Sequence, residues 1–376
     1  MSRISRFIAD VVAAPKSWRH KHELEKHGMK IFPLKCCLLG WLFCMASSLC
    51  AQNLMFGEED EAELPKDRTD FCRPGVINKS RGRGILLERR AVGAQHLAPD
   101  IGDIDGANAS DIARVERIKG KIKIPLVNAA DLKVLMGYEY ARETFHFSRI
   151  GYYNTDLFRS LDDNPLHTNK YSIYITKSFN DKYYAGLRVR TSYRGDHDKM
   201  ISFDERYATY SALLAFGIKP REDLEYGFGL TYSRGFFNNN LLPFGIYNQT
   251  FNKKWGIETV LPVRIMMRYN FTPKELLLFG VEFQSKSYSI DVYRQSERGL
   301  PPTPYYFRHA EIAWKATYDK HLFSWIWFTA EAGYQIPLNS RFDNTQDATL
   351  NFRTRATPQP FFNIGLFVSP SRDCVK

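Results

Sequence analysis

The sequence predicts an all-β protein, a transmembrane antiparallel up-and-down β-barrel of about 12 strands. Two observations lead to this fold. Apolar and polar residues alternate in stretch after stretch of the 376-residue chain, most regularly over residues 118–124. This period of two is typical of strands with one apolar and one polar face. Long and short connections also alternate between these stretches, as they do in bacterial outer-membrane barrels.

The first part of the chain has the features of an export signal. Lys30 and Lys35 precede an apolar core at residues 36–49, and the small residue Ala51 follows it. This order is typical of a secretory signal peptide, and the core is too short for a membrane-spanning helix. Met29 stands where the initiator of such a signal is expected.

Four regions follow from this interpretation. The segment after the signal is polar and acidic and has no period, which predicts a flexible lead on the periplasmic side. The predicted regions are 1–28, an upstream extension from a misassigned start; 29–51, the signal peptide; 52–80, the periplasmic lead; and 81–376, the outer-membrane barrel.

The net charge of the chain limits the kinds of partner that we expect. The formal net charge of +11 falls on export, because residues 1–51 hold eight of the 52 basic residues but three of the 41 acidic ones. The remaining charge suits solvated loops and lipid head groups and does not indicate nucleic acid. We expect outer-membrane lipid, lipopolysaccharide and the barrel-assembly machinery as partners, and the sequence predicts no oligomeric state.

The alternating stretches define the expected strands. They lie at 81–97, 112–126, 131–147, 170–180, 182–193, 206–218, 224–234, 255–271, 275–290, 305–319, 322–336 and 357–368. Long polar connections are expected at 98–111, 148–169, 194–205, 235–254, 291–304 and 337–356, with short turns between them. An even number of strands leaves both chain ends on the periplasmic side, as export requires.

The polar faces of these strands indicate which side looks inward. A soluble sandwich would bury its apolar faces, and alternation alone leaves that alternative open. Twelve strands, however, enclose more space than side chains fill, which favours an apolar face toward lipid and a polar face toward a lumen. The predicted lumen-lining residues are Lys119, Glu139, Arg188, Arg190, Glu258, Arg264, Glu282, Lys286, Glu311 and Lys315.

Folding adjacent strands about their expected turns pairs several of these residues. The predicted neighbours are Glu282 with Arg264, Glu258 with Lys286, Lys119 with Glu139, and Tyr174 with Arg188. Such charges form a constriction that selects solutes, or they stabilise the wall by cross-strand pairing. We favour pairing, because nearly neutral pairs make a poor selectivity ring.

The sequence contains one candidate for a catalytic site. His146 and Ser148 lie two residues apart on one strand face, as a base and nucleophile require, and they resemble the His-x-Ser pair of outer-membrane phospholipases. No matching Asn or calcium-type carboxylate cluster accompanies them. The mature chain has no histidines at metal-ligand spacing, so we expect no catalytic site, metal or cofactor.

Two cysteines remain after the signal, Cys72 and Cys374, close to the two ends of the mature chain. Both lie on the periplasmic side of the predicted topology, in an oxidising compartment. A disulfide between them would tie the lead to the C-terminal tail and requires the two Cα atoms to lie within about 4.4–6.8 Å of each other; free thiols are the alternative.

A family resemblance adds to this reading. Residues 252–258, Leu261-Pro262, Tyr269-Asn270, 276–282 and Ile122-Lys123-Ile124-Pro125-Leu126 resemble an uncharacterised family of outer-membrane β-barrel proteins of Gram-negative bacteria. The resemblance implies the barrel and its location over nearly the whole mature chain and implies no chemistry. The chain departs from the expected pattern where a tail to Lys376 follows its last strand.

Three functions fit these features. A polar lumen favours a passive pore or channel for small solutes. Balanced charge pairs and long aromatic loops favour a structural or surface-interaction barrel with a closed lumen. A membrane-embedded hydrolase is the third.

Overall fold

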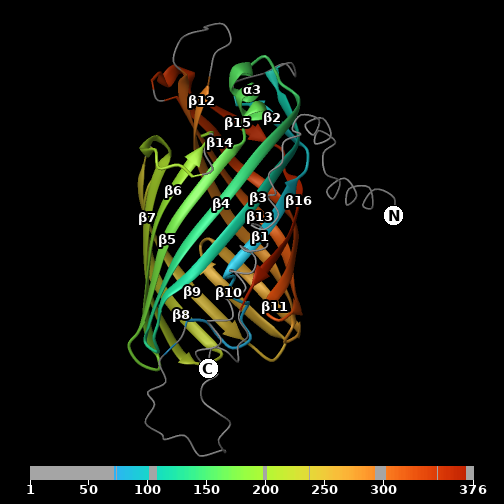
Figure 1. Ribbon diagram of the computed structural model, residues 1–376. Helices are drawn as coiled ribbons and strands as arrows, with labels where there is room; N and C mark the ends of the chain where they lie inside the picture. Colours follow the sequence, from blue (N-terminus) through green and yellow to red (C-terminus); the bar gives the residue numbers. More distant parts are fainter. Residues whose placement is uncertain are drawn as a thin grey trace, which may run out of the picture. The chain divides into compact units, whose positions relative to one another are not determined.

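The computed structural model describes residues 72, 74–100, 108–197, 201–236, 238–292, 302–344 and 346–369. The expected upstream extension and signal peptide lie outside these residues. All described strands belong to one sheet, which closes because the first and last strands pair, Ile85 lying opposite Val368. The wall is therefore a closed antiparallel barrel (Figure 1).

The strands of the sheet are β1 (Ile85–Val92), β2 (Gln95–Pro99), β3 (Ser110–Asn128), β4 (Leu132–Arg149), β5 (Leu166–Ser178), β6 (Tyr183–Gly195), β7 (Ala208–Arg221), β8 (Leu224–Arg234), β9 (Asn239–Thr250), β10 (Trp255–Leu261), β11 (Arg264–Thr272), β12 (Glu275–Val292), β13 (Thr303–Phe323), β14 (Ile326–Asn344), β15 (Phe352–Ala356) and β16 (Gln359–Val368). The helices in the described part of the chain are α3 (Thr155–Asp163) and the 3-10 turns η3 (Glu205–Tyr207) and η4 (Ala348–Leu350).

The described residues form a barrel of 14 strands, so the expected number of about 12 is wrong. β1 and β2 are two parts of one wall strand, and β15 and β16 are two parts of another. These two wall strands pair with each other; the first also pairs with β3 and the second with β14. Two strands were missed. A tight turn at residues 262–263 divides the expected strand 255–271 into β10 and β11, and the expected loop 235–254 contains β9. β9 has consecutive Leu241 and Leu242 followed by Pro243, which removes the period of two from its sequence.

The outer face of the wall is apolar. Along β3, β6, β7 and β13 the residues that alternate with charged or small ones are exposed and hydrophobic, among them Ile118, Val189, Leu214 and Trp314. Trp314 is 58% exposed although Lys315 beside it is largely buried. No helix in the described part of the chain is long and apolar enough to cross a membrane.

The two ends of the barrel differ. At the end that we call the turn end, short turns join the strands, as between β11 and β12; the opposite, loop end carries the longer connections. β12, β13 and β14 are 18, 21 and 19 residues long, whereas β10 has seven and β11 nine. The wall therefore rises unevenly, and its β8–β11 side is low (Figure 1).

Helix α3 closes part of the loop end. Asn154 precedes the helix in a left-handed conformation (φ 54°), and the Thr155 hydroxyl donates to the carbonyl of Gly151 (3.0 Å). Asp162 accepts a hydrogen bond from the backbone N–H of Phe147 (2.9 Å), which ties the helix to β4. The helix is amphipathic, and an apolar stripe of this kind packs against a core.

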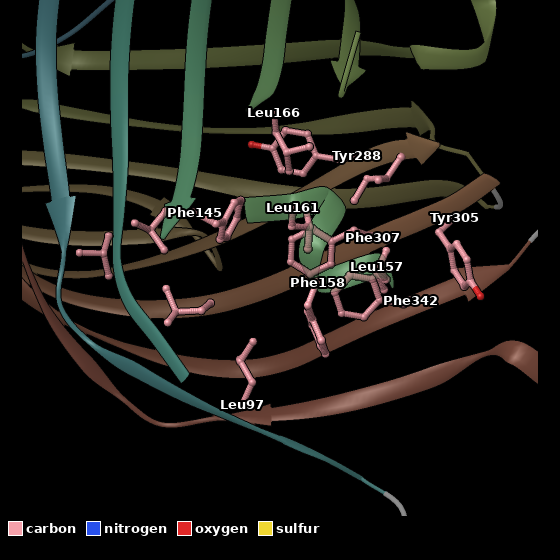
Figure 2. Packing of buried hydrophobic residues seen from close by; sticks show 14 of the residues in the cluster. Leu97, Phe145, Leu157, Phe158, Leu161, Leu166, Tyr288, Tyr305, Phe307 and Phe342 are labelled. Carbon is pink, nitrogen blue, oxygen red and sulfur yellow. The ribbon is translucent and has the colours of Figure 1, made fainter. Parts of the chain in front are cut away.

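That core lies inside the barrel. Leu157, Phe158 and Leu161 of α3 lie among Phe145, Phe307 and Phe342 of the wall (Figure 2). The rings of Phe158 and Phe342 meet edge to face at 6.0 Å, and those of Phe307 and Phe342 stack at 4.6 Å. The inner face at the loop end is thus apolar and packed.

The turn end is covered by the segment that leads into β1. The backbone N–H of Gly75 donates to Glu225 (2.7 Å), and the backbone and hydroxyl of Ser80 donate to Glu258 (2.8 and 2.6 Å). Arg83 forms an ion pair with Asp319 (3.1 Å). Residues 74–80 of the predicted flexible lead are thus bonded to inward-facing carboxylates, while residues 52–71 and 73 lie outside the described part.

Candidate functional site

The candidate site is the charged interior between these two closures. Strand parity puts all ten predicted lumen-lining residues on the inner face, alternating with the exposed apolar residues of the outer face. Two of the predicted pairings are confirmed by the register. Arg264 lies opposite Glu282, and Tyr174 lies opposite Arg188.

The expected pairing of Glu258 with Lys286 is wrong. The turn at 262–263 gives Glu258 a different neighbour, Arg268, whose guanidinium lies 3.0 Å from it. Lys286 instead reaches across the interior to Glu143 of β4 (3.1 Å). The expected pairing assumed that residues 255–271 form one strand beside 275–290. Because the chain turns at 262–263, only β11 lies beside β12, and Glu258 of β10 faces β11 instead.

The expected pairing of Lys119 with Glu139 is also wrong. Lys121 lies opposite Glu139, because β3 continues to Asn128, two residues beyond its expected end, and the turn into β4 therefore lies later in the chain. Lys119 forms an ion pair with Glu88 of β1, and Glu139 pairs with Lys170 of β5 at 2.5 Å.

The β12–β14 side of the interior is balanced in charge. Lys315 pairs with both Glu282 and Glu331, the latter at 3.0 Å. His309 lies 3.1 Å from Glu311. Carboxylates here have cationic or imidazole partners, which favours stabilisation of the wall.

The β3–β6 side of the interior is strongly basic. On its inner face β3, β5 and β6 contribute eight cations, whereas β4 contributes the two carboxylates Glu139 and Glu143 and, next to its turn, Lys133. The eight are Arg117, Lys119, Lys121, Lys123, Lys170, Arg188, Arg190 and Arg194. Of these, Lys119 and Lys170 alone make an ion pair within 4.0 Å among the residues described.

The remaining six cations have other contacts. Arg190 donates to the Ser172 hydroxyl (3.2 Å), and the Lys123 ammonium lies over the Tyr174 ring (4.6 Å). The Nε atoms of Arg117 and Arg194 are buried without a hydrogen-bond partner in the described structure. Buried donors that lack a partner are costly, so these guanidinium groups are suited to accept an anion.

A cavity of about 260 Å³ lies at this basic side. Arg117, Lys170 and Arg194 face Lys286 and Tyr288 across it, and Thr168, Phe283, Gln284 and Ser285 complete its lining. We call it the basic cavity. Residues of β3, β5, β6 and β12 meet here, although these strands are distant in sequence.

Sequence reasoning missed Arg117, Lys170 and Arg194 as site residues. The period of two that identified Lys119 extends back to Arg117, and the period through Ser172 and Tyr174 extends back to Lys170, so the signal was present. Arg194 fell outside the expected strand 182–193, which ends two residues before the observed end of β6 at Gly195.

The hydrolase candidate does not assemble. Phe145 and Phe147 of β4 pack inward, which turns His146 and Ser148 to the outer face. The Ser148 hydroxyl donates to the carbonyl of Asp111 (3.2 Å), and the described hydrogen bonds include none between Ser148 and His146. The described residues contain no group of three or more His, Cys, Asp or Glu side chains that could hold a metal ion.

Cys72 is buried at the turn end, where its backbone N–H donates to the carbonyl of Asn180 (2.7 Å). Burial raises the pKa of the Cys72 thiol. Cys374 lies outside the described residues, so its pairing with Cys72 stays a prediction.

Comparison with known proteins supplies no family. No family model matches the chain, and no curated protein matches it. The resemblance to an uncharacterised barrel family therefore stays a prediction at the level of the family.

Solved structures of other barrels resemble the chain weakly. A FadL homologue of Pseudomonas aeruginosa is 10% identical, with 76% of this chain and 89% of that chain covered and a TM-score of 0.40. The β domain of the Bordetella autotransporter BrkA is 12% identical (77% and 100% covered, TM-score 0.26), and the outer-membrane protease OmpT of Escherichia coli is 8% identical (78% and 99%, TM-score 0.29). Likenesses this weak carry no argument about activity. The described part of the chain forms a closed 14-stranded antiparallel β-barrel with an apolar outer face and a charged interior.

Proposed function

We propose that the protein is an outer-membrane channel for small anionic solutes that is closed at both ends in its resting state. The observation that supports this most is the basic β3–β6 side of the interior, where eight cations face two carboxylates. Rings of Arg and Lys are the usual selectivity element for anions.

Three features support the outer-membrane location. Exposed apolar residues cover the outer face of the strands, and the sheet closes on itself through the pairing of β1 with β16, as a β-structure in lipid requires. The signal peptide expected at residues 29–51 would direct export. Outer-membrane lipid, lipopolysaccharide and the barrel-assembly machinery remain the proposed partners.

The two closures favour a gated channel over the passive pore expected from sequence. Phe158 and its neighbours fill the loop end, and residues 74–84 are bonded across inward-facing carboxylates at the turn end. A solute passes only when both are displaced. The same closures favour the alternative, a structural barrel whose lumen stays closed.

Single-channel recording of residues 52–376 in a planar bilayer separates these functions. The test compares the unaltered chain with a variant that we call the opened barrel. It combines Leu157→Asp/Leu161→Asp, which places two charges in the apolar core beneath α3, with Arg83→Ala, which removes the ion pair to Asp319 at the turn end. We expect rare openings of the unaltered chain and frequent openings of the variant. In a KCl gradient, the reversal potential of the variant should show a higher permeability to chloride than to potassium.

A charge variant tests the selectivity element. In the opened barrel, Lys121→Gln/Lys123→Gln is expected to lower the anion preference. Lys253→Gln/Lys254→Gln, which removes the same charge from an exposed turn, is the matched control and should change nothing. Cation preference in the opened barrel would overturn the anion assignment, and a correctly inserted but silent opened barrel would support the structural alternative.

A further inference from the structure

The wall of the barrel has a gap between β9 and β12. β10 and β11 end at the turn that joins Leu261 to Arg264, and the highest bond between this hairpin and β12 runs from Phe283 N–H to the Val263 carbonyl (2.8 Å). Above it, residues 284–288 of β12 have no strand partner on that side among the described residues, although β13 pairs with all of them. Five residues of strand span about 17 Å.

The opposite side of the gap is the upper part of β9. β9 pairs with β10 only from Gly245 to Thr250, so residues 239–244 have a strand partner on the β8 side alone within the described structure. Leu242 lies opposite Thr231, on the inner face, whereas its neighbour Leu241 lies opposite Tyr232, on the outer face. Both leucines are exposed, Leu242 by 62%.

The gap is bounded above as well. Gly195 at the end of β6 pairs with Ser289 of β12 in parallel orientation. The turn between β8 and β9 also leans against this part of the wall, because the ring of Phe236 stacks on Tyr306 of β13 at 4.6 Å. Tyr306 is the neighbour of Ser289 in the sheet. We call the opening enclosed by β9, the β10–β11 turn, β12 and this junction the lateral window.

The basic cavity meets the lateral window. Phe283, Gln284 and Ser285, which line the cavity, belong to the unpaired stretch of β12 or adjoin it. On the membrane side the rim is apolar, with Leu241 and Leu261 exposed. Leu242 extends this apolar rim onto the inner face, and Arg194 and Lys286 lie at the cavity. Polarity therefore changes from apolar to cationic across the wall.

We propose that the lateral window binds single-chain anionic amphiphiles, with the anionic head group at Arg194 and Lys286 and the alkyl chain at Leu242 and Phe283. This rests on the proposed anion function and narrows its substrate class to an alkyl chain that ends in a phosphate or carboxylate. The buried, unpartnered Nε of Arg194 supplies a donor for an oxyanion. Packing of an alkyl chain against the exposed apolar rim removes apolar surface from water, which is favourable.

Titration of the refolded chain in nonionic detergent tests this, with dodecyl phosphate and inorganic phosphate as the two probes. We expect dodecyl phosphate to bind at least about tenfold more tightly than inorganic phosphate, because the chain adds apolar burial. Arg194→Gln should weaken both probes about tenfold. Leu242→Asp should weaken dodecyl phosphate alone.

The control is Leu214→Asp, an exposed leucine on the outer face of β7 away from the gap, which should leave both affinities unchanged. Equal binding of the two probes with no effect of Leu242→Asp would overturn the lateral window and leave the anion channel standing. If neither probe binds and the opened barrel prefers cations, the proposed function itself fails. Dodecyl phosphate that binds equally in Arg194→Gln overturns the head-group site.

Discussion

Gly195 of β6 and Ser289 of β12 pair side by side although five strands, β7 to β11, separate them in the order of the sheet. It is the one parallel pairing among the strands described. The junction draws the wall together above the low β8–β11 side and forms the top of the lateral window. The barrel therefore encloses fewer strands near its loop end than below.

Gly195 is required at this junction because no side chain fits there. A Cβ on Gly195 would collide with the Ser289 carbonyl and with the ring of Tyr207. We expect Gly195→Ala to lower the free energy of unfolding by roughly 1–3 kcal/mol, as overpacking does. Heat-induced unfolding in detergent, followed by gel mobility, measures the loss. Gly186→Ala on the same strand has space for a Cβ and should behave as the unaltered chain.

The junction should also depend on pH through Asp196. Its carboxylate accepts hydrogen bonds from the Asp291 N–H (2.7 Å) and the Tyr207 hydroxyl (3.3 Å). Burial, reinforced by the Asp291 carboxylate and opposed by these hydrogen bonds, raises the pKa of Asp196 to about 6 from 3.8. The folded state binds the proton of Asp196 more strongly than the unfolded state does. The stability that this proton contributes is therefore complete below pH 3.8 and is lost as the pH rises to about 6.

Asp196→Asn should remove the loss of stability that the unaltered chain shows as the pH rises, because the amide does not titrate. The difference in Tm between the unaltered chain and the variant is expected to shift in favour of the variant between pH 4 and 6 and to stay constant above about pH 7. Asp181→Asn, at an exposed turn, is the control. A Tm difference that does not change from pH 4 to pH 7 would contradict the role of Asp196.

Phe158 should hold the closure of the loop end. Its side chain is 2% exposed and touches Phe147, Phe342 and Phe352. Phe158→Ala leaves a cavity at a cost of about 3–5 kcal/mol, and we expect α3 to detach before the wall unfolds. Protease cleavage in residues 152–164 should therefore accelerate. Tyr152→Ala, at a side chain that is 84% exposed, should leave the rate unchanged.

Arg83 should hold the closure of the turn end. Its guanidinium pairs with the buried Asp319 at 3.1 Å and lies over the Phe367 ring at 5.0 Å. Arg83→Ala removes both contacts, and we expect trypsin to cleave after Lys79 several times faster in the folded barrel. Lys253→Ala at an exposed turn is the control. An unchanged cleavage rate would mean that the bonds of Gly75 and Ser80 suffice to hold the segment.

The sequence alone determined the barrel type and the inner face of most strands. Strand pairing makes side chains alternate between two environments, so the pattern Ile118-Lys119-Gly120-Lys121-Ile122 is legible without a structure. It also predicted that Arg264 faces Glu282, because a short turn determines the register between consecutive strands.

Only the tertiary structure decided the number of strands, the closures and the sites. β9 carries Leu241 and Leu242 side by side because its upper part borders a gap and both faces are open, so no alternation marks it as a strand. The pairing of Lys286 with Glu143, the position of Phe158 and the meeting of Gly195 with Ser289 join segments far apart in the chain. Local periodicity reports which face a residue occupies, and it contains no information about which distant strand lies across the lumen.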